Sequence, residues 1–149
     1  MIIIIFLLID QLIKQLVVSK MYLGQSIKII NNFFNITYVT NDGAAFNILS
    51  GNKIFLILVG LFVIIYILKN KDKLKEKYLY EILIAGILGN LIDRIFRGEV
   101  IDYLEFIIFG QNMAIFNFAD TCIVLSCIIL LILEVVKWKK SQLILKEKD

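Results

Sequence analysis

Four long blocks of apolar residues constrain this chain more than any other feature. They cover residues 1–9, 54–68, 79–91 and 119–133, separated by charged or turn-rich segments. With their flanks they approach the roughly 20 residues that a helix needs to cross about 30 Å of hydrocarbon. Hydrophobic residues make up 60% of the 149 residues, more than a soluble domain can bury. The sequence therefore predicts an all-α membrane protein with one integral membrane domain over 1–149, a bundle of four transmembrane helices near 1–18, 53–69, 79–97 and 116–137.

The first block is interpreted as a retained helix and not as a cleaved secretory signal. No basic residue precedes the apolar run, and Asp10 and Lys14 interrupt it. No site with the small-x-small pattern follows it, as a cleaved signal would require.

Lysines give the expected orientation in the membrane. Two segments are rich in them, the loop 70–78 with its edges and the tail 138–149 with its edge: Lys69, Lys71, Lys73, Lys75 and Lys77, and then Lys137, Lys139, Lys140, Lys146 and Lys148. The positive-inside rule places this loop and this tail in the cytoplasm. Both termini are then cytoplasmic, and the segments 19–52 and 98–115 face outward.

The two outward segments are expected to carry structure of their own. Residues 33–40 are rich in β-branched and aromatic residues and end in the turn-like Asn41-Asp42-Gly43, which predicts a small extracytoplasmic β element at the membrane surface. The second segment is amphipathic and aromatic. We expect part of it, around Tyr103–Phe109, to form a short interfacial helix.

Metal and thiol chemistry find little support in the sequence. The chain has no histidine, which argues against a zinc enzyme and against a histidine-based triad. Its two cysteines, Cys122 and Cys127, lie five positions apart in the fourth expected span. That spacing suits neither a metal site nor a disulfide, and small apolar packing is the common role of such residues.

Polar residues inside the expected spans need a reason, because a charge at the middle of a spanning helix costs about 2.5–3.5 kcal/mol. Asp10 and Lys14 lie on one helix face and can pair, either to fix helix packing or to serve a function. Asn90 and Arg94 share a face in the same way, with Asp93 beside them. Interfacial snorkelling would explain the arginine, and an interhelical hydrogen bond would explain the asparagine.

Two further carboxylates lie at the outer membrane edge, Asp102 after the third span and Asp120 at the start of the fourth. Asp102 taken alone can be a solvated loop residue, and Asn117-x-x-Asp120 can be a helix N-cap with an acid at the third position. Taken with the polar residues above, they suggest a shared site. Two carboxylates brought together cannot both ionise easily, so one keeps a proton while the other deprotonates a water, as in aspartic proteases.

Five ordered blocks of residues resemble one family, the lipoprotein signal peptidases (signal peptidase II). The match runs nearly end to end. The blocks are Asp10-Gln11-x-x-Lys14, Asn41-x-Gly43-Ala44-Ala45-Phe46, Gly89-Asn90-Leu91-Ile92-Asp93-Arg94, Gly98-x-Val100-Ile101-Asp102-Tyr103 and Phe116-Asn117-x-Ala119-Asp120. Tyr103 replaces the phenylalanine usual in that family, and Ala114-Ile115 stands where Trp-Pro is common. We expect these exchanges to matter little to the chemistry.

The resemblance implies an intramembrane aspartyl endopeptidase with Asp102 and Asp120 as the catalytic pair. It implies substrate-binding or supporting roles for a further set of residues: Asn41, Gly43, Asn90, Asp93, Arg94, Asn117, Ala119, Asp10 and Lys14. The expected substrate is a prolipoprotein whose cysteine carries a diacylglyceryl group, cut just before that cysteine to release the signal peptide. The expected protein is a monomer among the lipids of a bacterial cytoplasmic membrane, with its active site near the outer face. No metal, organic cofactor or nucleic acid is implied.

Two other classes remain possible from the sequence. A small transporter or channel subunit would use Asp10, Lys14, Asp93 and Arg94 as a polar path through the membrane. A non-catalytic scaffold would use the polar residues to hold helices together. The concentration of ionisable groups at the outer edge favours the peptidase.

Overall fold

The computed structural model describes residues 1–43, 49–72 and 74–146, with side chains described up to residue 143. Several residues of the sequence argument lie outside the described residues: Ala44, Ala45 and Phe46 of the second block, Lys73 of the basic loop and Lys148 of the tail, together with the side chain of Lys146.

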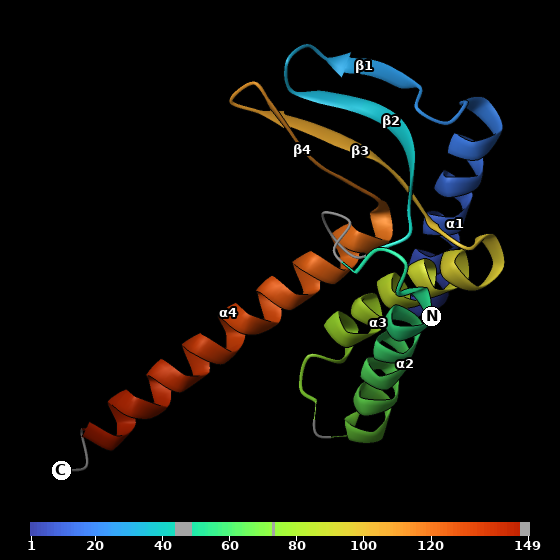
Figure 1. The fold of residues 1–149 in the computed structure, drawn as a ribbon. Helices are drawn as coiled ribbons and strands as arrows, with labels where there is room; N and C mark the ends of the chain where they lie inside the picture. Colours follow the sequence, from blue (N-terminus) through green and yellow to red (C-terminus); the bar gives the residue numbers. More distant parts are fainter. Residues whose placement is uncertain (44–48, 73, 147–149) are drawn as a thin grey trace.

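Four α-helices occur within the described residues: α1 (Ile2–Lys20), α2 (Lys53–Asn70), α3 (Lys77–Ile92) and α4 (Phe118–Lys146). Helix α3 packs against all three others (Figure 1). Among the described residues, α1, α2 and α4 are long and apolar enough to cross a membrane, so the membrane class predicted from hydropathy is supported. Helix α3 has 16 residues and continues directly into a π-helical turn, η2 (Asp93–Arg97).

Small residues let α3 approach its neighbours closely. A methyl group added at Gly89 would lie 2.5 Å from Oδ2 of Asp10 on α1 and 3.1 Å from the Ala119 side chain on α4. One added at Gly86 would lie 2.5 Å from the Ala119 carbonyl oxygen. Close backbone approach through small residues is the usual way in which helices associate in lipid.

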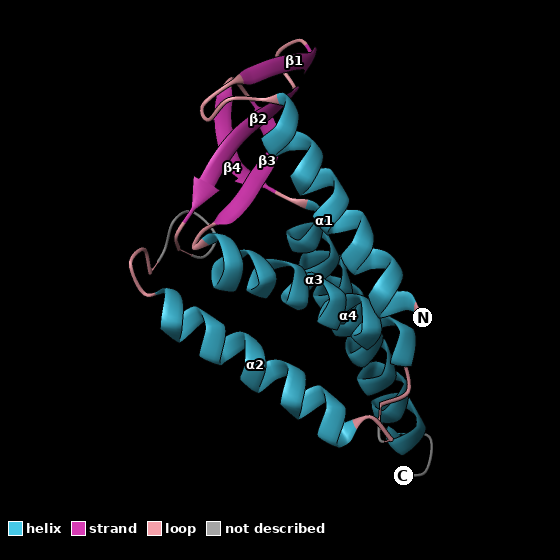
Figure 2. Cartoon of the chain, turned by 90° about the vertical axis from the view of Figure 1, so that its right-hand side faces the viewer, coloured by secondary structure: helices cyan, strands magenta, loops and turns pink. Residues whose placement is uncertain are grey.

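The two segments that were expected to face outward, 19–52 and 98–115, contribute one antiparallel sheet in the order β1-β2-β3-β4. Its strands are β1 (Ser26–Ile30), β2 (Phe34–Asn41), β3 (Val100–Ile108) and β4 (Gln111–Phe116). The β element expected in the first of these segments is therefore present, and it includes most of the second segment as well. Figure 2 shows the sheet at one end of the helices, beside the C-terminal end of α1.

The short interfacial helix expected around Tyr103–Phe109 is wrong, because most of that stretch is strand β3. Its residues pair with β2, as Asn35 does with Glu105 and Val39 with Asp102. Phe109 and Gly110 both have positive φ, 51° and 74°, and they join β3 to β4 in a two-residue hairpin turn. Strand β3 has nine residues and pairs with β2 on one side and β4 on the other. These backbone hydrogen bonds to two neighbouring strands stabilise the extended conformation over a surface helix.

A small apolar cluster attaches the sheet to the bundle. Val17 of α1 packs with Ile101 and Tyr103 of β3, and all three are buried. This contact fixes β3, and with it β2, above the ends of α3 and α4. Asn41 at the end of β2 and Asp102 in β3 are thereby brought to the helix ends that carry Asn90 and Asp120.

Candidate active site

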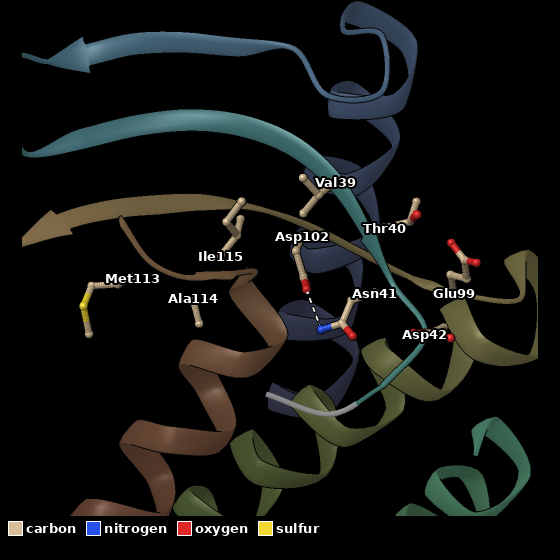
Figure 3. A pocket seen from close by; sticks show the side chains of 9 residues that line it. All are labelled: Val39, Thr40, Asn41, Asp42, Glu99, Asp102, Met113, Ala114 and Ile115. Carbon is tan, nitrogen blue, oxygen red and sulfur yellow. Dashed lines mark hydrogen bonds between the residues drawn. The ribbon is translucent and has the colours of Figure 1, made fainter. Parts of the chain in front are cut away.

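The Asp102 carboxylate is buried, with a residue exposure of 2%, and two asparagine amides hold it. Its Oδ1 accepts a hydrogen bond from Nδ2 of Asn117 at 2.7 Å. Its Oδ2 accepts one from Nδ2 of Asn41 at 3.0 Å (Figure 3). The alternative of a solvated loop residue is therefore wrong for Asp102.

The Asp120 carboxylate lies in the first turn of α4. Its Oδ1 accepts a hydrogen bond from Nδ2 of Asn90 at 2.7 Å, and its Oδ2 accepts one from the backbone N–H of Asn117 at 3.2 Å. In return, Oδ1 of Asn117 accepts a hydrogen bond from the backbone N–H of Asp120 at 2.8 Å. Asn117 and Asp120 therefore form a reciprocal helix cap of the capping-box kind, as the N-cap interpretation predicted.

Asn117 joins the two carboxylates. Its Nδ2 donates to Asp102 while its Oδ1 caps the residue that carries the second carboxylate. The same Nδ2 also donates to Oδ1 of Asn90 at 3.2 Å. Asn117 is completely buried, so its amide is held in one orientation. The N-cap interpretation and the shared-site interpretation of this residue thus both describe the geometry.

A buried ionic cluster lies next to this pair. Lys14 Nζ lies 2.9 Å from Oδ2 of Asp10 and 2.7 Å from Oδ2 of Asp93, and all three residues have an exposure of 1% or less. The lysine also donates to Oδ1 of Asn90 at 3.1 Å. Asn90 in turn donates to Asp120, so Asn90 connects the ionic cluster to the second carboxylate. The pairing expected from the spacing of Asp10 and Lys14 is confirmed, with Asp93 as a third member.

Two residues that the sequence argument did not single out complete the cluster. Gln11 donates from Nε2 to Asp10 at 3.1 Å and to the Gly89 carbonyl oxygen at 3.2 Å. Arg97 forms an ion pair with Asp93. Gln11 stands in the first of the five sequence blocks, so the block itself was a signal for it. Arg97 lies between the third and the fourth block and carried no such signal.

Arg94 ties the end of α3 to the end of β2. Its Nη2 donates to the carbonyl oxygen of Gly43 at 2.6 Å, while the Gly43 N–H donates to Oδ1 of Asn41 at 2.9 Å. The buried Nε of Arg94 has no hydrogen-bond partner among the described residues. Ala119 is fully buried, and its backbone N–H donates to Oδ1 of Asp10 at 3.0 Å. The candidate residues Asn41, Gly43 and Arg94 therefore belong to the same constellation as the two aspartates.

Two cavities meet at Asp102. The first has a volume of about 460 Å³ and is an apolar groove between α2, α3 and α4 that ends at five polar residues: Asn41, Asn90, Arg94, Asp102 and Asp120. The second, about 420 Å³, lies under the sheet between the end of β2 and strand β4 and includes Asp42 and Glu99 (Figure 3). Asn41, Asp102 and Ile115 line both cavities. Asp102 thus lines an apolar cavity on one side and a cavity of mixed polar and apolar lining on the other.

The surroundings of Asp102 make it hard to ionise. Burial raises the pKa of this carboxyl to about 7, the negative charge of Asp120 adds to the rise, and the hydrogen bonds from Asn41 and Asn117 oppose it. A carboxyl with a pKa near neutrality beside a second carboxylate can hold the proton that the other lacks. Such a pair can activate a water and protonate a leaving group. Among the described residues, no three His, Cys, Asp or Glu side chains are grouped to hold a metal ion.

Comparison with known proteins agrees with the resemblance. The family model described as signal peptidase (SPase) II matches residues 2–136. A lipoprotein signal peptidase of Staphylococcus epidermidis is 40% identical over 134 residues, covering 87% of this chain and 83% of that protein. One of Halothermothrix orenii is 39% identical over 135 residues, covering 88% and 90%. A solved bacterial membrane enzyme, determined at 2.3 Å by the in meso method, has a TM-score of 0.81 at 34% identity, covering 91% of this chain and 85% of that one.

Proposed function

Because this chain belongs to the signal peptidase II family and is an aspartic peptidase, we propose that it removes the signal peptides of prolipoproteins by hydrolysis at an Asp102/Asp120 dyad. The observation that carries the dyad is the shared contact with Asn117: this one side chain donates to Asp102 and caps Asp120. Both carboxylates also line the same groove.

In the proposed reaction the two aspartates share one proton. The ionised carboxylate takes a proton from a water molecule, and the resulting hydroxide attacks the carbonyl carbon of the scissile peptide bond. The protonated carboxyl then gives its proton to the leaving nitrogen as the carbon–nitrogen bond breaks. The products are the carboxylate of the signal peptide and the free amino group of the cysteine. The raised pKa of Asp102, about 7, supports one retained proton at neutral pH, as the mechanism needs.

Arg94 and the asparagines are the proposed donors to the substrate. The carbonyl oxygen of the scissile bond becomes negative as the hydroxide adds, and donors arranged in advance stabilise that charge. Arg94 lines the groove beside both aspartates, and its buried Nε has no hydrogen-bond partner among the described residues. We therefore assign Arg94 Nε as a donor to a carbonyl oxygen of the bound substrate.

The groove suits a substrate that is itself embedded in lipid. Away from its polar end, the groove is lined by apolar side chains of α2, α3 and α4, and α4 diverges from α2 along its length (Figure 1). A signal helix and the acyl chains of a diacylglyceryl cysteine are apolar and reach the protein through the bilayer, so burial in this groove is favourable. The second cavity, on the other side of Asp102 and lined by both polar and apolar residues, is then the path of the chain that follows the cysteine.

The proposed setting is the bacterial cytoplasmic membrane. Helix α3 together with η2 crosses the membrane as the third of four spans, both termini are cytoplasmic, and the sheet and the dyad lie at the outer face. The lysines of the α2–α3 loop and of the tail support this orientation. The enzyme is proposed to act as a monomer.

The lipid requirement tests the proposal. Purified protein in lipid bicelles would be given one prolipoprotein in two forms, with and without the diacylglyceryl group on its cysteine. We expect cleavage before the modified cysteine and at least a hundredfold slower cleavage of the unmodified form, about 2.7 kcal/mol in transition-state stabilisation. Equal rates would refute the lipid part of the proposal. If neither form were cleaved, the peptidase proposal would fail and the transporter and scaffold interpretations would be favoured instead.

A further inference from the structure

We propose that the hydroxyl of Tyr103 is a positioning group that ties the strand of Asp102 to the helix of Asp120 and so fixes the separation of the two carboxylates. This inference rests on the proposed function. It concerns a residue at which the chain departs from the phenylalanine usual in the family that it resembles, and it replaces the expectation that this exchange matters little, because the hydroxyl accepts a hydrogen bond from α4.

The first turn of α4 is held by side chains at every backbone amide. The first N–H groups of a helix have no partner inside the helix, and here each finds one outside the backbone ladder. Asn117 and Asp120 cap each other's N–H groups. The Ala119 N–H donates to Asp10 of α1 at 3.0 Å. The Phe118 N–H donates to the hydroxyl oxygen of Tyr103 at 3.1 Å.

These hydrogen bonds reach α4 from different elements. Among the described residues, Tyr103 is the only side chain of β3 that accepts a hydrogen bond from these backbone N–H groups. The Tyr103 ring is buried with an exposure of 4%. It packs with Val17 and Ile101, and Phe118 packs against the same cluster. The ring is therefore fixed, and its hydroxyl holds a fixed point on the helix.

Both ends of this hydrogen bond lie close in the chain to one of the two aspartates. Tyr103 follows Asp102 in the chain, and Phe118 precedes Asp120 by two residues. Because successive side chains of a strand point to opposite faces, Tyr103 can hold α4 from one face of β3 while Asp102 faces the site from the other. A shift of α4 along or away from β3 would stretch this contact before it changed the carboxylate separation greatly.

Strand β4 leads into α4 and pairs with β3, as Leu104 does with Phe116, and Asn117 adds a second side-chain link, through Asp102. That link uses a carboxylate oxygen that must also serve the reaction. The Tyr103 hydroxyl holds the same two elements without touching a reacting atom. It can therefore keep the dyad in place when the charge on Asp102 changes during turnover.

Tyr103→Phe tests this role cleanly, because it removes one oxygen and keeps the ring. The matched control is Tyr38→Phe: the Tyr38 ring packs against the same cluster, and its hydroxyl makes no hydrogen bond within the part of the chain that the structure describes. For each variant, kcat and KM would be measured on the lipid-modified prolipoprotein across pH. We expect Tyr103→Phe to lower kcat about tenfold with KM unchanged, and Tyr38→Phe to match the wild type.

The pH profile separates positioning from general loss of stability. The charged groups that act on the Asp102 carboxyl are Asp120 from α4, Lys14 from α1 and Arg94 from η2. Asp42 and Glu99 line one cavity with it. If the two aspartates separate in Tyr103→Phe, their repulsion weakens and the basic limb of the kcat profile moves to lower pH. Loss of folded protein alone would lower the whole profile without moving its limbs.

A second variant removes the donor in place of the acceptor. Phe118→Pro deletes the N–H at the first helical position, where proline is tolerated. In the Phe118→Pro variant the Tyr103 hydroxyl has lost its partner, so adding Tyr103→Phe should lower kcat less than twofold further. A tenfold loss of kcat on adding Tyr103→Phe to both the wild type and Phe118→Pro would overturn the inference. So would a Tyr103→Phe variant with unchanged kcat and an unchanged pH profile, or a Tyr38→Phe control that loses as much kcat as Tyr103→Phe. Full wild-type activity in those cases would leave the proposed function standing, whereas an inert wild type would remove both.

Discussion

Lys14 is the residue whose loss should destabilise the fold most directly. It lies between two buried carboxylates, 2.9 Å from Asp10 and 2.7 Å from Asp93, and its exposure is 0%. With Arg97, which pairs with Asp93, the cluster holds two negative and two positive charges and is neutral. Lys14→Met keeps most of the side-chain volume and leaves the cluster with a net charge of −1.

Removing one partner of a buried ion pair typically costs about 3–5 kcal/mol, because an uncompensated charge stays buried. A loss of this size is a large part of the stability of an ordinary domain, about 5–15 kcal/mol. For a chain of this size it corresponds to a fall of roughly 10 °C in the melting temperature. Thermal unfolding in a mild detergent, followed by circular dichroism, measures the change directly.

A double variant tests whether the unpaired buried charge causes the loss of stability. Adding Asp10→Asn to Lys14→Met returns the cluster to neutrality, with Asp93 still paired to Arg97. An asparagine at position 10 can still accept the hydrogen bond from Ala119. We expect the double variant to recover at least half of the lost melting temperature. A double variant less stable than Lys14→Met, or a single variant within 1–2 °C of the wild type, would refute the reasoning.

Three further changes test other parts of the site. Gly89→Ala should cost about 1–3 kcal/mol of stability by overpacking, because the new methyl would lie 2.5 Å from a carboxylate oxygen of Asp10; chemical unfolding would measure it, and a neutral effect would contradict the close packing. Asn117→Ala should cost about 1 kcal/mol through loss of the helix cap and lower kcat more than a hundredfold, since Asp102 loses a hydrogen bond and Asp120 its cap. Because the pKa of Asp102 is raised to about 7, kcat should fall as pH rises through about 7 and the shared proton is lost; a rate that is flat to pH 9 would exclude the shared proton.

Hydropathy predicted the helices well, because long apolar runs carry their own signal. Helices lie over each of the four ranges in which a span was expected, although only α1, α2 and α4 are by themselves long and apolar enough to cross a membrane among the described residues. The lysine pattern predicts their orientation, and that prediction awaits a topology measurement. Local sequence was also sufficient for β2, where β-branched and aromatic residues are concentrated.

Strand β3 was misassigned because its sequence fits both structures. Asp102 and Glu105 lie three residues apart, which places them on one face of a helix and supports an amphipathic interfacial interpretation. The partners that decide the matter are far away in sequence, since Asn35 pairs with Glu105 and forms a side-chain hydrogen bond with it. A single sequence does not reveal such a pairing.

The candidate site was predictable in its members and not in its connections. The five sequence blocks named the residues that the structure brings together around Asp102 and Asp120, while their catalytic roles stay predictions. The bridge through Asn117 and the anchor from Tyr103 depend on how β3 lies against the first turn of α4. That arrangement is set by tertiary packing, so Tyr103 could be noticed in the sequence only as an exchanged residue.

The central claim is that Asp102 and Asp120 together hydrolyse the peptide bond. Its most direct test is cleavage of the lipid-modified prolipoprotein by the wild type, Asp102→Asn and Asp120→Asn, with Asp72→Asn in the exposed α2–α3 loop as a matched control. We predict at least a thousandfold loss of kcat in each dyad variant, about 4 kcal/mol, with folding retained and the control fully active. Substantial turnover by either dyad variant would contradict the two-aspartate mechanism.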